Sequence, residues 1–329
     1  MMSKKTKIVL WAVIAVVLTA LLVWGIAGAT SFGNTVSNFF ANLSVGDFVD
    51  KLPDNAQTSD KFEVPDAQQI SQISMRFVDE DIELVLTDEA VIRVEETSGD
   101  TIKKEDMMHH SVKKDALVVQ SGRAGRMFGW INNYKIKVRV MIPRSYSGVI
   151  DIQSVSGTLA AEQIAAVSAI YTTTAGDITI NGGVCDDMRV KSISGDIGIT
   201  DAKVGHLRAD TTSGKIDMRG VFERVNAGST SGELLLEAAG AMDISTDTTS
   251  GSTKIKCADA ENLESISASS VSGNVEIMLP SDCGFMRRYD TMSGSEDNGF
   301  VMRGGISGDG MVDIGVDTVS GSLRMAQNN

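Results

Sequence analysis

Two carboxylates offer the clearest opportunity for chemistry in this sequence. Asp177 and Asp196 each follow a glycine in a recurring motif, 19 residues apart, and on adjacent rungs of a parallel sheet they would stand about 4.8 Å apart. That distance is near the ~5–5.5 Å between the carboxylates of a retaining glycosidase, and it would also allow a shared calcium ion. Lys215 follows at the same position. Such rows on a sheet surface are commonly solvated charges, so both sites remain secondary hypotheses.

Other motifs for chemistry are weaker. His109 and His110, with Asp106 nearby, could bind a metal, but neighbouring residues of a strand point to opposite faces. The segment Gly304–Asp309 resembles one calcium-binding β-roll repeat, with Ser307 in place of a glycine and no tandem copy. The sequence contains no Walker loop, HExxH or GxGxxG motif. We therefore expect no enzymatic activity and no cofactor, and Asp177 and Asp196 stay the weak candidates for a metal.

A repeated tetrapeptide predicts the elements that would position these side chains. From residue 154 onward the pattern Ser/Thr-x-Ser/Ala-Gly recurs nine times, with successive glycines 18 to 27 residues apart. A period of about 20 residues is typical of solenoids, in which each unit buries its apolar face only against its neighbours. Each glycine would form a corner, where the chain needs a positive φ or close backbone approach. These glycines are Gly157, Gly176, Gly195, Gly214, Gly232, Gly251, Gly273, Gly294 and Gly321.

Apolar and polar residues alternate on both sides of the corner, which is the period of a strand with one buried face. Two residues after the glycine stand Leu159, Ile178, Ile197, Ile216, Leu234, Thr253, Val275, Glu296 and Leu323. Seven residues before it stand Ile150, Ala169, Met188, Leu207, Val225, Ile244, Ile266, Arg287 and Ile314. The sequence therefore predicts an all-β protein, a parallel β-solenoid of about nine short coils over residues 149–329, about 43 Å long.

The regular pattern fails toward both ends of the predicted solenoid. Arg287 and Glu296 occupy apolar columns, and the last glycine spacing is 27 residues, which indicates a loop or capping insertion near residues 281–312. Residues 61–148 lack the tetrapeptide in register but alternate like strands, most strictly over Tyr134–Ile142. We interpret them as an irregular β N-terminal cap, continuous with the solenoid, that covers its strand edges.

These features resemble the bacterial DUF4097 family, whose members are labelled "putative adhesins" and include LiaG-like β-strand repeat proteins. The resemblance is carried by the alternating strand that ends at Pro143 and by the serial units Ser-Val-Ser-Gly-Thr-Leu, Ser-Ile-Ser-Gly-Asp-Ile and Thr-Thr-Ser-Gly-Lys-Ile, and it covers roughly residues 61–325. It implies a β-solenoid, often membrane-tethered, in a Gram-positive or Bacteroidetes envelope. It supplies no catalytic residues.

Composition and charge limit the classes of partner. The chain has 329 residues, 42% of them hydrophobic and 5% aromatic, with 32 Gly and 4 Pro, which suits short strands joined by tight turns. Its net charge of −13 repels the phosphates of nucleic acid, so we expect no nucleic-acid partner. The cysteines Cys185, Cys257 and Cys283 follow no metal or disulfide pattern.

An apolar stretch near the N-terminus predicts a membrane anchor. Residues 8–29 are uncharged and would form a helix of about 33 Å, with Trp11 and Trp24 near its ends. Because three lysines precede the stretch, residues 1–7 should be cytoplasmic and the body extracytoplasmic, as a single-pass protein of the cell membrane. Ala27–Ala29 resembles a signal-peptidase site, but the apolar run exceeds the usual ~7–15 residues, which favours an uncleaved anchor.

Residues 30–60 join the anchor to the β region. Phe32, Val36, Phe39, Phe40 and Leu43 recur at helical spacing. They predict an amphipathic helix on the outer membrane surface, a helix packed on the first strands, or a juxtamembrane linker that runs to Pro53 and Asp54.

The sequence leaves three hypotheses for function. The first is a non-catalytic, membrane-anchored extracytoplasmic module for adhesion or envelope interaction, with a surface glycan or an envelope protein as its partner. The second is an accessory regulator of an envelope-stress signalling system that acts through the membrane helix. The third is a carbohydrate-active enzyme that uses Asp177 and Asp196.

Overall fold

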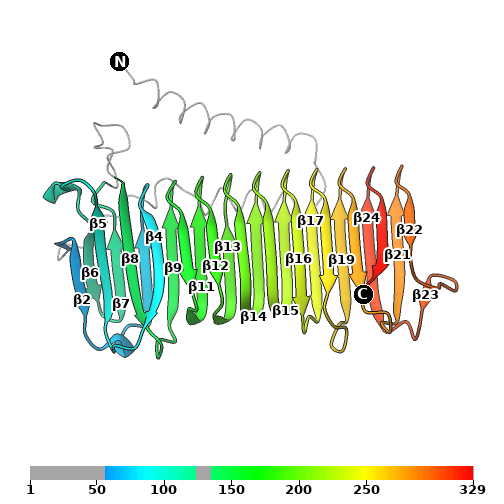
Figure 1. Cartoon of the computed structure of the whole chain (residues 1–329), viewed down its shortest axis with the longest axis horizontal. Coiled ribbons are helices and arrows are strands. Elements are labelled where there is room, and N and C mark those ends of the chain that lie inside the picture. The colour runs from blue at the N-terminus through cyan, green and yellow to red at the C-terminus, as the bar shows by residue number, and fades with distance from the viewer. Residues whose placement is uncertain (1–55, 124–134, 329) are drawn as a thin grey trace, which may run out of the picture. The chain divides into compact units, whose positions relative to one another are not determined.

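The computed structural model describes residues 56–123 and 135–328, which lie within the unit Pro53–Asn329. Apart from two 3-10 turns, η2 (Ala67–Gln69) and η3 (Lys104–Asp106), the regular structure in these ranges is β-strand. The predicted all-β class is thereby confirmed. The strands form one 25-stranded unclosed sheet that folds into two layers (Figure 1).

Layer 1 contains the strands that precede the corners. In spatial order it consists of β1 (Gln57–Thr58), β6 (His109–Lys113), β7 (Ala116–Gln120), β3 (Gln72–Arg76), β9 (Val149–Ser154), β11 (Ala165–Thr173), β13 (Val184–Lys191), β14 (Ile197–Thr211), β15 (Ile216–Ser229), β17 (Asp243–Thr248), β19 (Ser265–Ser270), β24 (Val312–Thr318), β21 (Phe285–Thr291) and β23 (Ile306–Ser307).

Layer 2 contains the strands that follow the corners. In spatial order it consists of β2 (Lys61–Val64), β5 (Ile92–Ser98), β8 (Ile136–Pro143), β4 (Asp81–Thr87), β10 (Leu159–Glu162), β12 (Ile178–Asn181), the first residues of β14 and β15, β16 (Leu234–Ala239), β18 (Thr253–Cys257), β20 (Val275–Leu279), β25 (Leu323–Gln327) and β22 (Glu296–Asn298). Strands β14 and β15 run through both layers because no turn interrupts them at the second corner.

Equivalent residues of successive coils stand directly opposite each other. Leu159 pairs with Ile178, Ile178 with Ile197, and Ile197 with Ile216, all in parallel strands. These are the residues of the predicted apolar column. The parallel pairing continues through all nine coils that carry the tetrapeptide, because each coil returns its strands to the same place in the stack.

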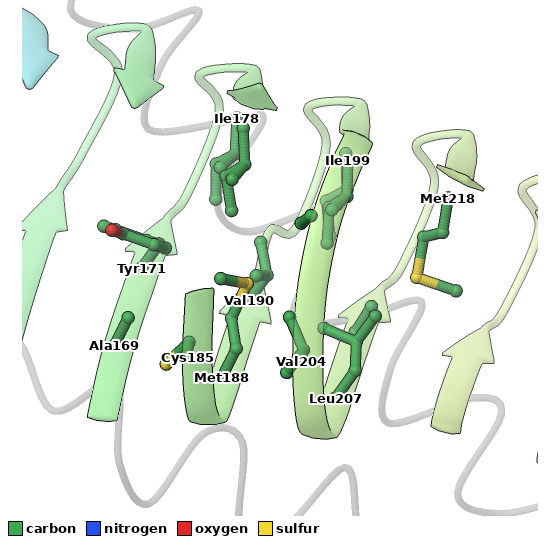
Figure 2. Close-up of a cluster of buried hydrophobic side chains, with 14 of the residues drawn as sticks. Ala169, Tyr171, Ile178, Cys185, Met188, Val190, Ile199, Val204, Leu207 and Met218 are labelled. Carbon is green, nitrogen blue, oxygen red and sulfur yellow. The ribbon is translucent and has the colours of Figure 1, made fainter. Parts of the chain in front are cut away.

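The hydrophobic core fills the space between the two layers. In its central part, shown in Figure 2, side chains from layer 1 face side chains from layer 2. Tyr171, Met188 and Leu207 come from layer 1, and Ile199 and Met218 come from layer 2. Each is at most 4% exposed. Alternation along short strands thus yields one continuous core, which each coil shares with its neighbours.

The coils at the C-terminal end do not stack in the order of the sequence. The last coil, β24–β25, lies between the coil β19–β20 and the coil β21–β22. The chain therefore first builds the outermost coil and then returns to fill the place beneath it. The irregularity predicted near residues 281–312 is this excursion, which also carries the small antiparallel strand β23 against β21.

A similar excursion occurs at the N-terminal end. Strands β3 and β4 lie between β7–β8 on one side and β9–β10 on the other, again in parallel pairs. Residues 61–148 thus contribute two coils that lack the tetrapeptide. Beyond them, β6 and β1 extend layer 1, and β5 and β2 extend layer 2, as antiparallel strands. This antiparallel end covers the edge that the parallel stack would otherwise expose.

The predicted membrane anchor, residues 8–29, lies outside the described residues, as do residues 30–55 with their amphipathic pattern. In the described ranges, no helix has the length and apolar character needed to span a membrane.

Candidate functional site

The Ser-Gly corners are built by one hydrogen bond and one close approach. In most coils the Ser or Thr hydroxyl accepts the N–H of the glycine three residues later, as from Gly195 to Ser192 (2.8 Å) and from Gly232 to Ser229 (2.7 Å). A Cβ on Gly214 would come within 2.0 Å of the carbonyl oxygen of Gly195 in the preceding coil. None of the nine corner glycines has a positive φ. Close backbone approach, and not a left-handed conformation, therefore requires glycine here.

Asp177 and Asp196 lie on adjacent coils, and each carboxylate bonds the backbone of the next coil. Oδ1 of Asp177 accepts the N–H of Asp196 (2.8 Å), and Oδ1 of Asp196 accepts the N–H of Lys215 (2.7 Å). Asp81 bonds Thr158 in the same way (3.0 Å). We call these side-chain-to-backbone bonds amide staples. They satisfy corner N–H groups that would otherwise lack a partner in the protein.

The staples give this column a structural use that the sequence analysis missed. Its signal was available, since a short Asp or Asn side chain at a turn commonly accepts a nearby backbone N–H. Further along, Asn274 accepts the N–H of Ser322 (3.0 Å) by the same geometry. Within the two described ranges, no group of three or more His, Cys, Asp and Glu side chains is arranged to hold a metal ion.

The histidines and the glycine-rich segment are placed separately. His109 shares a hydrogen bond between Nδ1 and Thr58 Oγ1 (2.9 Å), whereas His110 stacks on Phe62 with ring centroids 3.7 Å apart. Burial lowers the pKa of His110. In Gly304–Asp309, Oδ1 of Asp309 accepts the N–H of Met311 (3.2 Å), which closes a local turn.

A buried polar cluster replaces the Ser-Gly corner in the coil β3–β4. Glu80 occupies the place of the corner glycine, and its carboxylate accepts the N–H of Val78 (2.7 Å). The carboxylate also accepts the hydroxyl of Ser121 and lies 2.9 Å from the guanidinium of Arg123. Both Glu80 and Arg123 are fully buried. Removal of either partner would leave the other charge buried and unpaired, which is strongly destabilising.

Glu96 lies near this cluster and has a raised pKa. Its Oε2 accepts the N–H of Met108 (2.9 Å), and the residue is only 5% exposed. Burial, and to a lesser degree the charge of Glu80, raises the pKa of Glu96 to about 7. The cap therefore contains a carboxyl group that titrates near neutral pH.

Arg287 and Glu296, the two charged residues in the apolar columns, form an ion pair within the outermost coil. Both side chains are mostly covered, because these positions point toward the core. Tyr289 adds a hydrogen bond from its hydroxyl to the carbonyl of Gly321 (2.8 Å). The end of the core is thus closed by polar groups, which disfavours pairing with another strand edge.

The three cysteines are buried free thiols. Burial raises the pKa of Cys185 to about 11 and that of Cys257 to about 12. Such thiols are protonated at neutral pH and are poor nucleophiles.

This set of features, a stack of Ser-Gly corners with polar outer columns, has a counterpart among known families. Residues 70–300 match the family model described as Toastrack DUF4097. The chain belongs to the DUF4097 family. The resemblance predicted from the tetrapeptide is thereby confirmed. No curated protein matches the sequence.

Several solved structures are similar to this DUF4097 chain. A "putative adhesin" from Bacteroides fragilis NCTC 9343 is 12% identical, with 84% of this chain and 98% of that chain covered and a TM-score of 0.44. A "putative adhesin" from Parabacteroides merdae ATCC 43184 is 15% identical, with 84% and 97% covered and a TM-score of 0.43. A "putative lipid binding protein" from Parabacteroides distasonis ATCC 8503 is 16% identical, with 84% and 98% covered and a TM-score of 0.39.

Large exposed apolar side chains of this DUF4097 domain gather toward its C-terminal end. Of the eleven in the described ranges, seven lie between residues 271 and 319: Val271, Met286, Met292, Val301, Ile306, Met311 and Val319. On the long outer faces, by contrast, charged neighbours pair across coils, as Lys254 does with Glu276 (3.0 Å) and Lys256 with Glu237 (2.7 Å). The C-terminal end is therefore the part of the described surface with the most apolar area to bury.

Three of these side chains form a continuous row, which we call the corner stripe. Val271, Val319 and Met292 occupy the same corner position in three adjacent coils, two residues before the glycine. The N–H of Ser320 bonds Val271 (3.0 Å) and the N–H of Met292 bonds Val319 (3.2 Å). Their exposed fractions are 48%, 45% and 84%. Four of the six preceding coils have threonine here: Thr174, Thr212, Thr230 and Thr249.

Proposed function

We propose that this DUF4097 protein is a non-catalytic interaction module of the bacterial cell envelope, whose solenoid is a rigid scaffold for a contact surface at its C-terminal end. The observation that carries the proposal is the corner stripe. At this position the last three coils carry exposed valine or methionine. Of the six preceding coils, four carry threonine, one carries the buried Ile193 and one carries the half-buried Val155. Methionine is enriched at surfaces that bind protein partners, and a contiguous exposed apolar row commonly marks such a surface. An envelope protein is therefore favoured over a surface glycan as the partner.

The amide staples support a scaffold rather than an enzyme. Asp177 and Asp196 each commit one oxygen to a backbone N–H at 2.8 and 2.7 Å, and a side chain that holds the scaffold together is poorly suited to move during catalysis. The exposed ends of the column lie on an outer strand surface, beside the charges of Lys215 and Asp217.

Site-specific photo-crosslinking tests the contact surface. A photoreactive residue is placed at Met292, and a matched control is placed at Thr230, the same corner position in a central coil. We expect one discrete crosslinked partner from position 292 in host cells, and we expect its loss when Val319→Asp is added. Equal crosslinking from both positions, or none from position 292, would contradict the proposal.

Membrane attachment through residues 8–29 is part of the same proposal. The support is the length of the uncharged stretch and the lysines that precede it. The full chain should sediment with membranes and resist carbonate extraction, and a protease added outside the cell should reach the solenoid. A chain without residues 1–29 should be soluble. If the shortened chain still sediments with membranes, another element holds it there.

The regulatory alternative makes a different prediction. A regulator of an envelope-stress system would need the membrane helix to transmit a signal, so replacing residues 8–29 with an unrelated anchor should abolish the response. An interaction module should retain its crosslinked partner with any anchor. The two outcomes can be measured in the same strains.

A further inference from the structure

A hollow lies at the C-terminal end, on a side away from the Ser-Gly corners. It is formed by the loop that carries β23, which projects from the end of the solenoid (Figure 1), against Ser281 and Gln327. Its volume is about 590 Å³, within the ~300–1,000 Å³ that is usual for small-molecule sites. It contains none of the residues of the corner stripe.

Apolar side chains line one part of the hollow. Phe300 is held edge-to-face against Phe285, with ring centroids 5.0 Å apart at 89°. Val301 and Ile306 stand beside it with exposed fractions of 85% and 42%. These groups form a surface on which a hydrocarbon chain could be removed from water.

The loop is held in this shape by its backbone. Arg303 and Ile306 exchange two hydrogen bonds, of 2.8 and 3.2 Å, around Gly304 and Gly305, whose φ values of 58° and 84° favour glycine. Strand β23 then pairs with Phe285 and Met286. The exposed apolar side chains are thus presented by a defined turn and not by an unstructured segment.

Arg303 supplies the charge of the hollow. Over the two described ranges it is the one arginine whose guanidinium makes neither an ion pair nor a hydrogen bond. In a chain with a net charge of −13, carboxylates are abundant, yet none is placed against this side chain. An unpaired guanidinium beside an apolar wall is complementary to an anionic group attached to an apolar chain.

We propose that this hollow binds an amphiphile with an unbranched apolar tail and an anionic head, either a carboxylate or a phosphate. The tail would lie along Phe300, Val301 and Ile306, and the head would pair with Arg303. Ser281 and Gln327 also line the hollow, and hydroxyl and amide side chains are able to donate further hydrogen bonds to the head.

The test uses the full chain in zwitterionic nanodiscs and a photoreactive dodecanoate with a diazirine near the end of its tail. Mass spectrometry should map the label to residues 299–308. Unlabelled dodecanoate or dodecyl phosphate should compete, and the stronger competitor identifies the head group. Dodecanol, which has the same tail and no charge, should compete at least roughly tenfold less well, because it forfeits a charge-assisted hydrogen bond.

Variants separate the contributions of charge and apolar wall. Arg303→Gln should weaken labelling roughly tenfold, Arg303→Lys should retain part of it, and Val301→Ser should weaken it without changing the preference for an anionic head. Arg144→Gln is the control, since Arg144 is an exposed arginine paired with Asp88 at 2.8 Å and is not part of the hollow. Circular dichroism verifies that each variant is folded.

Three results would overturn the proposal. The first is a label that is spread along the chain or unchanged in Arg303→Gln. The second is equal competition by dodecanol. The third is displacement by an acidic apolar peptide under conditions where neither anionic amphiphile competes, which would assign the hollow to a protein segment. None of these results bears on crosslinking from position 292, so the two proposals can fail separately.

Discussion

At the scale of single residues, the corner glycine is the position that tolerates least change. Gly214→Ala places a methyl group within 2.0 Å of the carbonyl oxygen of Gly195, so two coils must move apart. We expect a loss of about 3 kcal/mol in the free energy of unfolding, measured by urea denaturation. Gly198→Ala is the matched control, because a Cβ there meets nothing within 4 Å. An equal loss in both variants would show that strand propensity, and not close approach, is responsible.

The amide staples predict a difference between two substitutions of one residue. Asp196→Ala removes the acceptor for the N–H of Lys215 and should cost about 1 kcal/mol of stability. Asp196→Asn keeps an acceptor oxygen on a side chain of the same length. Its midpoint of thermal denaturation should therefore remain close to that of the unsubstituted protein. If the Asn variant is as unstable as the Ala variant, the negative charge matters more than the hydrogen bond. A broad panel of glycans should show no hydrolysis by any of the three proteins.

Glu96 predicts a pH dependence of stability. Because the pKa of Glu96 is raised to about 7 in the folded state, above its usual value near 4.5, the fold retains a proton that the unfolded chain releases. The free energy of unfolding should therefore fall as pH rises from about 4.5 to 7, by on the order of 3 kcal/mol. Glu96→Gln should remove this fall and be the more stable protein at pH 8. Comparing the two proteins at each pH cancels the other titrating groups.

At the scale of elements, the transposed C-terminal coils make opposite predictions for two deletions. Removing residues 312–329 takes away β24 and β25, which lie inside the stack, so β21 and β22 lose their only parallel neighbours in layers 1 and 2 of the described structure. We expect residues beyond about 280 to become sensitive to protease. Removing residues 282–310 instead leaves a glycine spacing of 19 residues between Gly273 and Gly321, and this protein should fold. Limited proteolysis of both proteins measures the difference, and equal resistance would contradict the observed stacking order.

Elements whose position is set within one repeat unit could be predicted from the sequence. Elements whose position depends on how the units stack could not. Alternation and the 19-residue period predicted the strands, the corners and the inward columns, since each of these follows from a single unit. The order of the last two coils could not be read in this way, because the units of Gly294 and Gly321 carry the same tetrapeptide and either could follow Gly273. Arg287 and Glu296 were the available signal: charged side chains in a core column mark the coil at which the core ends.

In the candidate site, too, the features that follow from the repeat could be predicted from the sequence, and those that depend on the three-dimensional path of the chain could not. The spacing of 19 residues predicted that Asp177 and Asp196 would lie on adjacent coils, and they do. It could not predict that each carboxylate turns along the stack toward a backbone N–H, because that depends on the three-dimensional path of the corner. The polar cluster around Glu80 and Arg123 was also missed, since these residues are separated by more than forty positions and meet only when β7 stacks on β3.

At the scale of the whole molecule, the solenoid remains a bounded structure because both of its ends are closed. The antiparallel strands close one end, and the Arg287–Glu296 pair closes the other. Replacing both charged residues with leucine should extend the apolar columns to the surface and promote end-to-end association. Sedimentation equilibrium should then show a concentration-dependent increase in mass relative to the unsubstituted protein. A mass that stays equal to that of the unsubstituted protein would show that the ion pair is not what prevents pairing.

Because one coil is transposed, the protein cannot stack its last coils in the order in which they are synthesised. A ribosome delivers residues 285–298 before residues 312–327, yet the first of these segments can stack only on the second. The outermost coil must therefore wait, with both of its strands unpaired along the stack, until residues 312–327 have emerged. A chain that lacks residues 312–327 would keep both strands unpaired along the stack, and unpaired strand edges are prone to associate with other chains.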